Sequence, residues 1–369
     1  MVKRRGLAAL ALGMALVIAA VGCAEDDDFL IGGKRPSTKP TTKPGGTGDT
    51  GGGNGDGSDL GGGIGTGDKP VATPTPAPTP TPTPEPTPPP SGTLVDSYPL
   101  QWENPESIAF DAQGNAWMAN YGDGVFTSYV TKLDPSGQLL LEPPVGIAPK
   151  QVLVDRQGNA WVANSGSGTV TRIASDAGTT TSVEIGAAPR AMALSPDGDE
   201  LWIAADTLVA LDLATQATRS VVPFPTTGIA FHGEKAWVAY AASSSVGVYS
   251  LGGQFEREVT LNSSPGLVRA STDSVWVLTS TGGTRIEPET YATRDLSSGT
   301  SLDLAIDKDG GAWVSYSGSP GLIRRFAADG GFAGVVYLGL APHGLAFHPS
   351  TGYLWVTDRT GQKVHVYVP

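Results

Sequence analysis

Residues with charged or hydrogen-bonding side chains recur at two positions of a unit that is repeated through the second part of the chain. One position, just before a short apolar stretch, holds Glu106, Lys150, Arg190, Thr227, Gly266, Leu302 and His343. The other, just after a Trp-containing stretch, holds Asn120, Asn164, Asp206, Tyr240, Thr279, Tyr316 and Asp358. Carboxylate and amide oxygens bind hard cations such as Ca²⁺ and Mg²⁺, and a His beside a carboxylate can move a proton. If the fold gathers these residues, they could bind a ligand, hold a metal or catalyse a reaction.

The repeated unit is marked by seven tryptophans: Trp117, Trp161, Trp202, Trp237, Trp276, Trp313 and Trp355, spaced by 44, 41, 35, 39, 37 and 42 residues. Each copy has an apolar stretch, a turn rich in Asp, Gly and Asn, the Trp stretch, and two further alternating stretches. Four short antiparallel strands at a period of about 40 residues are typical of a propeller blade. The sequence therefore predicts an all-β, seven-bladed propeller of four-stranded blades over residues 94–369.

The two ends of the repeat region complete each other. The last copy stops after its third strand, at residues 364–368, and one extra strand-like stretch, residues 94–100, precedes the first copy. If that stretch supplies the outer strand of the last blade, the ring closes and no sheet edge is left exposed there. We therefore expect the N-terminal strand to close the last blade.

In such a ring, the loops that enter each first strand and leave each second strand lie on one face, around a central channel. We expect a ligand-binding face there, made by Glu106, Asn120, Lys150, Asn164, Arg190, Asp206, Tyr240, Tyr316, His343 and Asp358. His232 and His348 take the place of Asp111 in the hairpin turn, which predicts that they are turn residues at the opposite face. His365 falls in a third strand.

The repeats also carry a family resemblance. Residues 186–198 (GAAPRAMALSPDG) resemble the YVTN-type propeller repeat, and the Asp-x-x-Gly-Asn-x-Trp-Val-x-Asn frames resemble NHL and virginiamycin B lyase repeats. The resemblance covers about 275 residues. It implies the propeller fold strongly and function weakly, because the shared residues are those of packing and turns.

Two enzymatic alternatives follow from the resemblance. A lyase of the virginiamycin B type would need paired His and Glu residues and a divalent metal, and only His343 and Glu106 are catalytic candidates here. A hydrolase resembling the gluconolactonase-like propellers would hold Ca²⁺ or Mg²⁺ on oxygen ligands. The metal candidates are Glu106, Asn120, Asn164, Asp206 and Asp358.

The N-terminus predicts export and a lipid anchor. Residues 1–22 combine the basic Lys3-Arg4-Arg5 with an apolar run too short for a confident membrane span, as in a signal peptide. Ala20-Val21-Gly22-Cys23 resembles a bacterial lipobox, which implies acylation of Cys23, the chain's single cysteine. Residues 23–93 form a Gly-rich and then Pro/Thr-rich linker, expected to be disordered. We expect an extracytoplasmic protein of the cell envelope, at the periplasmic side or the cell surface, anchored to a membrane by lipid.

Charge narrows the expected partners. Residues 94–369 contain 16 Lys and Arg against 27 Asp and Glu, so the domain lacks the cationic surface that nucleic-acid binding requires. No Ser-His-Asp pattern or Gly-rich phosphate loop is visible in it. The sequence favours a monomeric, non-catalytic binding or scaffold module for a protein, peptide or glycan, with the metal-dependent enzymes above as the alternative and no cofactor beyond that metal.

Overall fold

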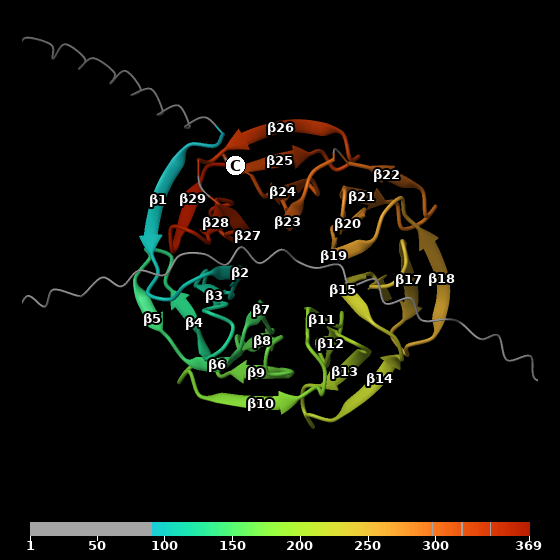
Figure 1. Ribbon diagram of the computed structural model, residues 1–369, viewed down its shortest axis with the longest axis horizontal. Coiled ribbons are helices and arrows are strands. Elements are labelled where there is room, and N and C mark those ends of the chain that lie inside the picture. Colours follow the sequence, from blue (N-terminus) through green and yellow to red (C-terminus); the bar gives the residue numbers. More distant parts are fainter. Residues whose placement is uncertain (1–90, 297, 319, 340) are drawn as a thin grey trace, which may run out of the picture. The chain divides into compact units, whose positions relative to one another are not determined.

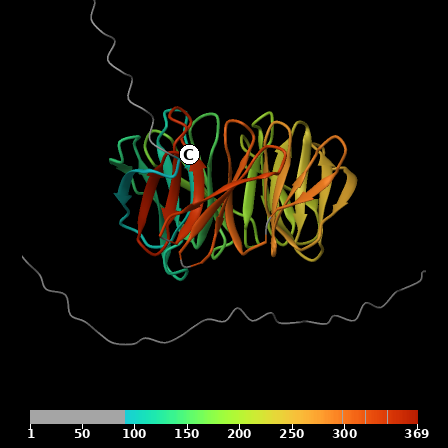
Figure 2. The same ribbon diagram turned by 90° about the horizontal axis from the view of Figure 1, so that it is seen from above.

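The computed structural model describes residues 91–369 except 297, 319 and 340, and these residues form an all-β ring. Seven sheets stand around a common axis (Figure 1). Seen edge-on, the strands run between two faces of a flat disc (Figure 2). The predicted seven-bladed propeller is confirmed. The signal peptide predicted at 1–22, Cys23 and nearly all of the linker lie outside the described residues.

Each blade is an antiparallel sheet whose strands follow one another from the axis outward. Blade 1 contains β2 (Pro105–Phe110), β3 (Ala116–Asn120), β4 (Thr127–Leu133), β5 (Leu139–Leu141) and β6 (Pro144–Ile147). Blade 2 contains β7 (Pro149–Val154), β8 (Ala160–Asn164), β9 (Thr169–Ile173) and β10 (Thr180–Glu184). Blade 3 contains β11 (Ala191–Leu194), β12 (Glu200–Ala204), β13 (Leu208–Asp212) and β14 (Thr218–Val222).

The remaining blades repeat this arrangement. Blade 4 contains β15 (Thr226–His232), β16 (Lys235–Tyr240), β17 (Ser245–Ser250) and β18 (Phe255–Thr260). Blade 5 contains β19 (Pro265–Ala270), β20 (Val275–Thr279), β21 (Gly282–Ile286) and β22 (Thr293–Asp295). Blade 6 contains β23 (Ser301–Ile306), β24 (Ala312–Tyr316), β25 (Leu322–Phe326) and β26 (Phe332–Tyr337). Blade 7 contains β27 (Pro342–Phe347), β28 (Leu354–Asp358), β29 (Lys363–Tyr367) and, as its outer strand, β1 (Leu94–Pro99).

The ring closes through β1, as the extra N-terminal stretch predicted. Leu94 lies opposite Tyr367 and Tyr98 opposite Val364 in an antiparallel pair with β29. The pairing extends beyond the strand, because the Gly92 N–H donates to the Val368 carbonyl at 2.7 Å. The two ends of the described fold therefore hold each other.

Blade 1 departs from the predicted four strands. Its outer strand is split into β5 and β6, both of which pair with β4. Pro143 lies between the two pieces and Pro144 begins β6, and a proline has no N–H to donate to a sheet ladder. The prolines account for the interruption.

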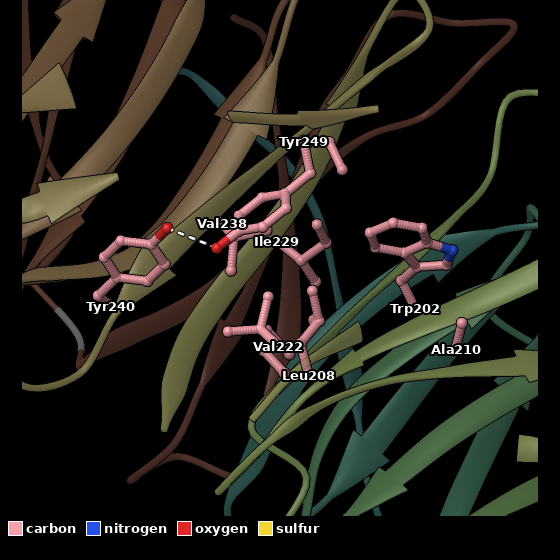
Figure 3. Close-up of a cluster of buried hydrophobic side chains, with 11 residues drawn as sticks. Trp202, Leu208, Ala210, Val222, Ile229, Val238, Tyr240 and Tyr249 are labelled. Carbon is pink, nitrogen blue, oxygen red and sulfur yellow. Dashed lines mark hydrogen bonds between the residues drawn. The ribbon is translucent and has the colours of Figure 1, made fainter. Parts of the chain in front are cut away.

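The repeated tryptophans fill the spaces between blades. Trp117, Trp161, Trp202, Trp237, Trp276 and Trp313 are at most 1% exposed. Trp202 of blade 3 packs with Ile229 and Val238 of blade 4, in the cluster that Figure 3 shows. Burying a large apolar side chain stabilises the fold by roughly 1.5–3 kcal/mol. The tryptophans thus hold neighbouring blades together rather than facing a ligand.

The turn before each Trp strand explains the Asp-x-x-Gly-Asn-x-Trp frame. The Asp111 carboxylate accepts hydrogen bonds from the Asn115 N–H at 2.8 Å and the Trp117 indole N–H at 3.3 Å. Gly114 takes a φ of 82°, which favours glycine. In blade 7 His348 replaces the Asp, and its Nδ1 accepts the turn N–H of Thr351 at 3.3 Å. The predicted turn role of His348 is confirmed.

Candidate functional site

The first residues of the inner strands surround a cavity on the ring axis. Its volume is about 210 Å³. It is lined by all seven residues of the first repeated position: Glu106, Lys150, Arg190, Thr227, Gly266, Leu302 and His343. Six of them are the second residue of the innermost strand of their blade, and Arg190 lies just before β11. Because these strands all begin at the same face, residues far apart in sequence meet there.

A buried carboxylate is the centre of the charge network. Glu106 lies 3.6 Å from Lys150 Nζ, 3.2 Å from His343 Nε2 and 3.4 Å from Arg359 Nη2. The ring of Tyr121 packs under two of these cations, with Lys150 Nζ 4.3 Å from its centroid and Arg359 Cζ 5.9 Å away. The network joins blades 7, 1 and 2. Tyr121 and Arg359 each lie one residue past the second repeated position, and sequence reasoning missed Arg359.

Both catalytic candidates belong to this network. His343 Nε2 faces the Glu106 carboxylate, and Nδ1 lies 3.0 Å from the Glu106 backbone carbonyl oxygen. Both ring nitrogens therefore have a partner on the same residue. Neither nitrogen is free to take a proton from a substrate in this arrangement. The pair fixes blade 7 against blade 1.

A second, partly buried ion pair lies deeper in the cavity. Arg269 Nη2 is 3.7 Å from Asp303 Oδ1, and Asp303 also accepts the backbone N–H groups of Leu304 at 2.8 Å and Leu345 at 2.9 Å. Burial raises the pKa of Asp303 and lowers the pKa of Arg269, while each opposes the other's shift. Sequence reasoning missed this pair. The signal was a charge inside an otherwise apolar inner strand, as in the β23 sequence SLDLAI.

Several lining residues also join neighbouring blades. Thr227 Oγ1 donates to the Pro265 carbonyl at 2.9 Å, and Arg190 Nη1 donates to the Thr226 carbonyl at 3.4 Å. Ser107 Oγ accepts the Val152 N–H at 3.3 Å. These side chains therefore have a structural role whether or not a ligand binds.

No residue of the second repeated position lines the cavity. Asn120 and Asn164 are fully buried, and each Nδ2 donates to a threonine hydroxyl, of Thr131 at 2.9 Å and of Thr171 at 2.8 Å. The second strand lies one layer out from the axis, and its last residue turns toward the third strand. The amides stabilise their own blades.

Tyr240 and Tyr316, which were predicted for the binding face, are also core residues. Tyr240 and Tyr249 share a hydroxyl–hydroxyl hydrogen bond of 2.7 Å inside the cluster of blades 3 and 4 (Figure 3). Burial raises the pKa of Tyr240 well above its usual value. Tyr316 is 3% exposed, with the Arg324 guanidinium 4.4 Å from its ring centroid. Neither tyrosine lines the central cavity.

The five metal candidates are not brought together. Asp206 pairs with Arg190 at 2.9 Å, and Asp358 accepts the N–H groups of Thr360 and Gly361 within its own loop. Of the five, Glu106 alone lines the cavity, where its partners are cations. No group of three His, Cys, Asp or Glu residues in the described part of the chain could hold a metal ion. These residues do not fit a divalent-metal site.

Known structures share this fold. No protein-family model and no curated protein matches the chain. A streptogramin B lyase matches with TM-score 0.64 at 17% identity, over 74% of this chain and 96% of that chain. A catalytically inactive variant of virginiamycin B lyase from Staphylococcus aureus, with quinupristin, matches with TM-score 0.64 at 14% identity, over 74% and 98%. The hydrazine synthase of Kuenenia stuttgartiensis matches with TM-score 0.63 at 16% identity, over 75% and 98%.

The likeness shows the fold. The resemblance that the repeats carried to virginiamycin B lyase-like propellers is confirmed at that level. At these identities it transfers no activity to this chain, so function is argued from the cavity's own residues. Within the described residues, we found no helix with the length and apolar character needed to span a membrane.

Proposed function

We propose that the propeller is a non-catalytic binding module of the cell envelope, which receives a carboxylate-bearing group of a peptide or glycan in its central cavity. One observation carries this proposal. Among the charged residues that line the cavity, the most exposed are cations: the Lys150 and Arg190 side chains are 39 and 38% exposed, and Arg190 pairs with the exposed carboxylate of Asp206 just outside the lining. The carboxylates of Glu106 and Asp303 are 3 and 13% exposed. Within this lining, the cations are therefore more open to a ligand than the carboxylates.

The contrast with the rest of the surface strengthens the argument. The domain as a whole carries a net negative charge, yet its axial cavity presents cations. A concave site focuses the field of the charges that line it, which favours entry of an anion. An arginine or lysine beside a carboxylate ligand makes charge-assisted hydrogen bonds of roughly 2.7–2.9 Å. Catalysis is less well supported, because His343 has both nitrogens engaged.

The proposed anchor agrees with this use of the cavity. Leu94 and Leu354 both lie opposite Tyr367, and Leu354 lies opposite Phe347 at the far end of β27. The N-terminal segment therefore joins the ring at the face opposite the cavity. A linker to an acylated Cys23 would not have to cross the cavity mouth.

The proposal is tested by calorimetric titration of the protein without its first 23 residues. One arm compares N-acetylalanine with its amide, and the other compares glucuronic acid with glucose, so that peptide and glycan sources are distinguished. We expect a carboxylate form to bind in at least one arm and its neutral partner to bind at least tenfold more weakly. Equal affinity of charged and neutral forms, or no binding in both arms, would overturn the proposal.

A charge variant and a control sharpen the result. Arg190→Gln should weaken carboxylate binding, because the guanidinium is a half-exposed cation at the mouth. Lys308→Gln, which removes an exposed cation that lines no part of the cavity, should leave binding unchanged. Equal losses for both variants would indicate a non-specific charge effect and count against the site.

A further inference from the structure

The axial cavity continues into a second one, which is lined mainly by residues with apolar side chains. This second cavity has a volume of about 300 Å³ and shares Gln151 and Arg269 with the charged cavity. Its other lining residues, all apolar, are Ile108, Ala109, Val152, Leu153, Met192, Ala193, Leu194, Ile229, Ala230, Phe231 and Val268. They come from the inner strands of five successive blades, β2, β7, β11, β15 and β19. A charged mouth thus lies above an apolar segment of the same channel.

The lining side chains pack against the clusters between the blades but are not fully covered by them. Ala109, Leu153, Ala193 and Phe231 are only partly buried, although they lie on the inner strands. Water in contact with such a lining costs free energy, which an apolar ligand group would recover by displacing it. The lining presents no charge below Arg269, whose guanidinium is paired with Asp303.

The two residues shared by the cavities are held in place by the fold. Gln151 Oε1 accepts the Met192 N–H at 2.6 Å, and its Nε2 donates to the Met192 carbonyl at 3.2 Å. Arg269 is fixed by Asp303 and by a hydrogen bond to the Val268 carbonyl at 3.2 Å. These contacts hold both side chains against the channel wall, at the boundary between its charged and apolar parts.

We propose that the ligand is a carboxylate that bears an apolar chain, with the carboxylate at the mouth and the chain among the apolar residues below. This inference rests on the proposed carboxylate site and names the class of ligand that site receives. Lys150 and Arg190 bind the head, and residues such as Leu153 and Phe231 contact the chain. Two kinds of molecule carry a carboxylate and an apolar chain in this way: a free alkanoic acid, and a peptide whose C-terminal residue has an apolar side chain.

A chain-length series tests the inference. Acetate, hexanoate and decanoate, kept below their aggregation limits, are titrated into the protein from residue 24 onward, with N-acetylglycine and N-acetylleucine as the peptide arm. Each methylene that leaves water should raise affinity by up to about fourfold. We expect hexanoate to bind at least tenfold more tightly than acetate, or N-acetylleucine at least tenfold more tightly than N-acetylglycine, and hexylamine not to bind.

Channel-filling variants localise the effect. Ala193→Phe and, separately, Ala109→Leu should abolish the affinity gain from acetate to decanoate, while Ala214→Phe on an exposed turn should keep it. Two positions in different blades are used, with thermal melting of each, so that one misfolded variant does not decide the test. Acetate binding with no gain along either series would overturn this inference and leave the proposed function standing. Failure of every carboxylate to bind, glucuronic acid included, would overturn both.

Discussion

Glu106 is the residue on which the cavity depends most. Its buried carboxylate faces two half-exposed cations, Lys150 and Arg359, and also His343. It therefore has two effects: it stabilises the ring, and it neutralises part of the positive charge at the cavity mouth. Breaking a buried ion pair by removing one partner leaves the other charges uncompensated. Stability and ligand binding should therefore respond to this residue in opposite directions.

The variant Glu106→Gln separates the two roles. We expect a loss of about 1–3 kcal/mol in unfolding free energy, less than for a fully buried pair because the cations keep part of their water. Carboxylate binding should become tighter, because the variant removes a repelling charge from the cavity. Urea unfolding and titration with N-acetylalanine measure the two effects, and Glu103→Gln, an exposed acid before β2, is the control. Weaker binding in Glu106→Gln would contradict the assigned role.

Asp111 predicts a specific pH dependence. Burial opposes its ionisation, but hydrogen bonds from Asn115, Lys132 and Trp117 outweigh that effect and lower its pKa below the usual 3.8. Because its pKa is lower in the folded chain, ionised Asp111 stabilises the fold at any pH above the pKa of Asp in the unfolded chain. This contribution is lost as the pH falls through and below 3.8.

Asp111→Asn should cost about 1–3 kcal/mol at pH 7 and flatten the loss of stability between pH 5 and pH 3. Melting temperatures across that pH range measure it. Asp273→Asn, in the equivalent turn of blade 5, serves as control, since that exposed Asp carries no such hydrogen bonds in the described structure. If the melting temperature of Asp111→Asn fell with pH as much as that of the wild type, the Asp111 carboxylate would not be what stabilises the blade.

At the level of the strands, the fold could be predicted and the direction of individual side chains could not. Seven Trp frames and one extra strand were enough to predict the ring and its closure. Asn120 and Tyr240 were expected at the binding face, yet their partners Thr131 and Tyr249 lie in a neighbouring strand that position in the repeat does not reveal. Arg269 was missed because it lies inside an inner strand, away from the two repeated positions at which ligand-binding residues were expected.

Ring closure can be tested by removing β1. Deletion of residues 91–100 leaves β29 with an unpaired edge and removes the pairs from Leu94 to Pro99. We expect a lower melting temperature and self-association through the open edge, seen by size-exclusion chromatography. Deletion of residues 24–81, outside the propeller unit, should leave both properties unchanged. A β1 deletion that melts like the full chain would mean that the last blade holds without its outer strand.

At the scale of the whole molecule, an acidic ring presents a small cationic cavity on its axis, and its outer strand β1 begins at the other face. Composition indicated the acidity. The local inversion of charge could not be predicted, because it depends on which charged side chains are buried at a meeting point of several blades. Carboxylate binding should weaken as salt rises from 50 to 500 mM, because the cations are half exposed to screening ions.

The most direct test of the central claim is one titration series by calorimetry: N-acetylalanine and its amide against the wild-type protein and the Lys150→Gln/Arg190→Gln double variant. The account predicts that the wild type binds the carboxylate at least tenfold more tightly than the amide, and that the double variant loses this preference while melting within a few degrees of the wild type. Unchanged preference in the folded double variant would contradict it, because the carboxylate would then be recognised somewhere other than this cavity.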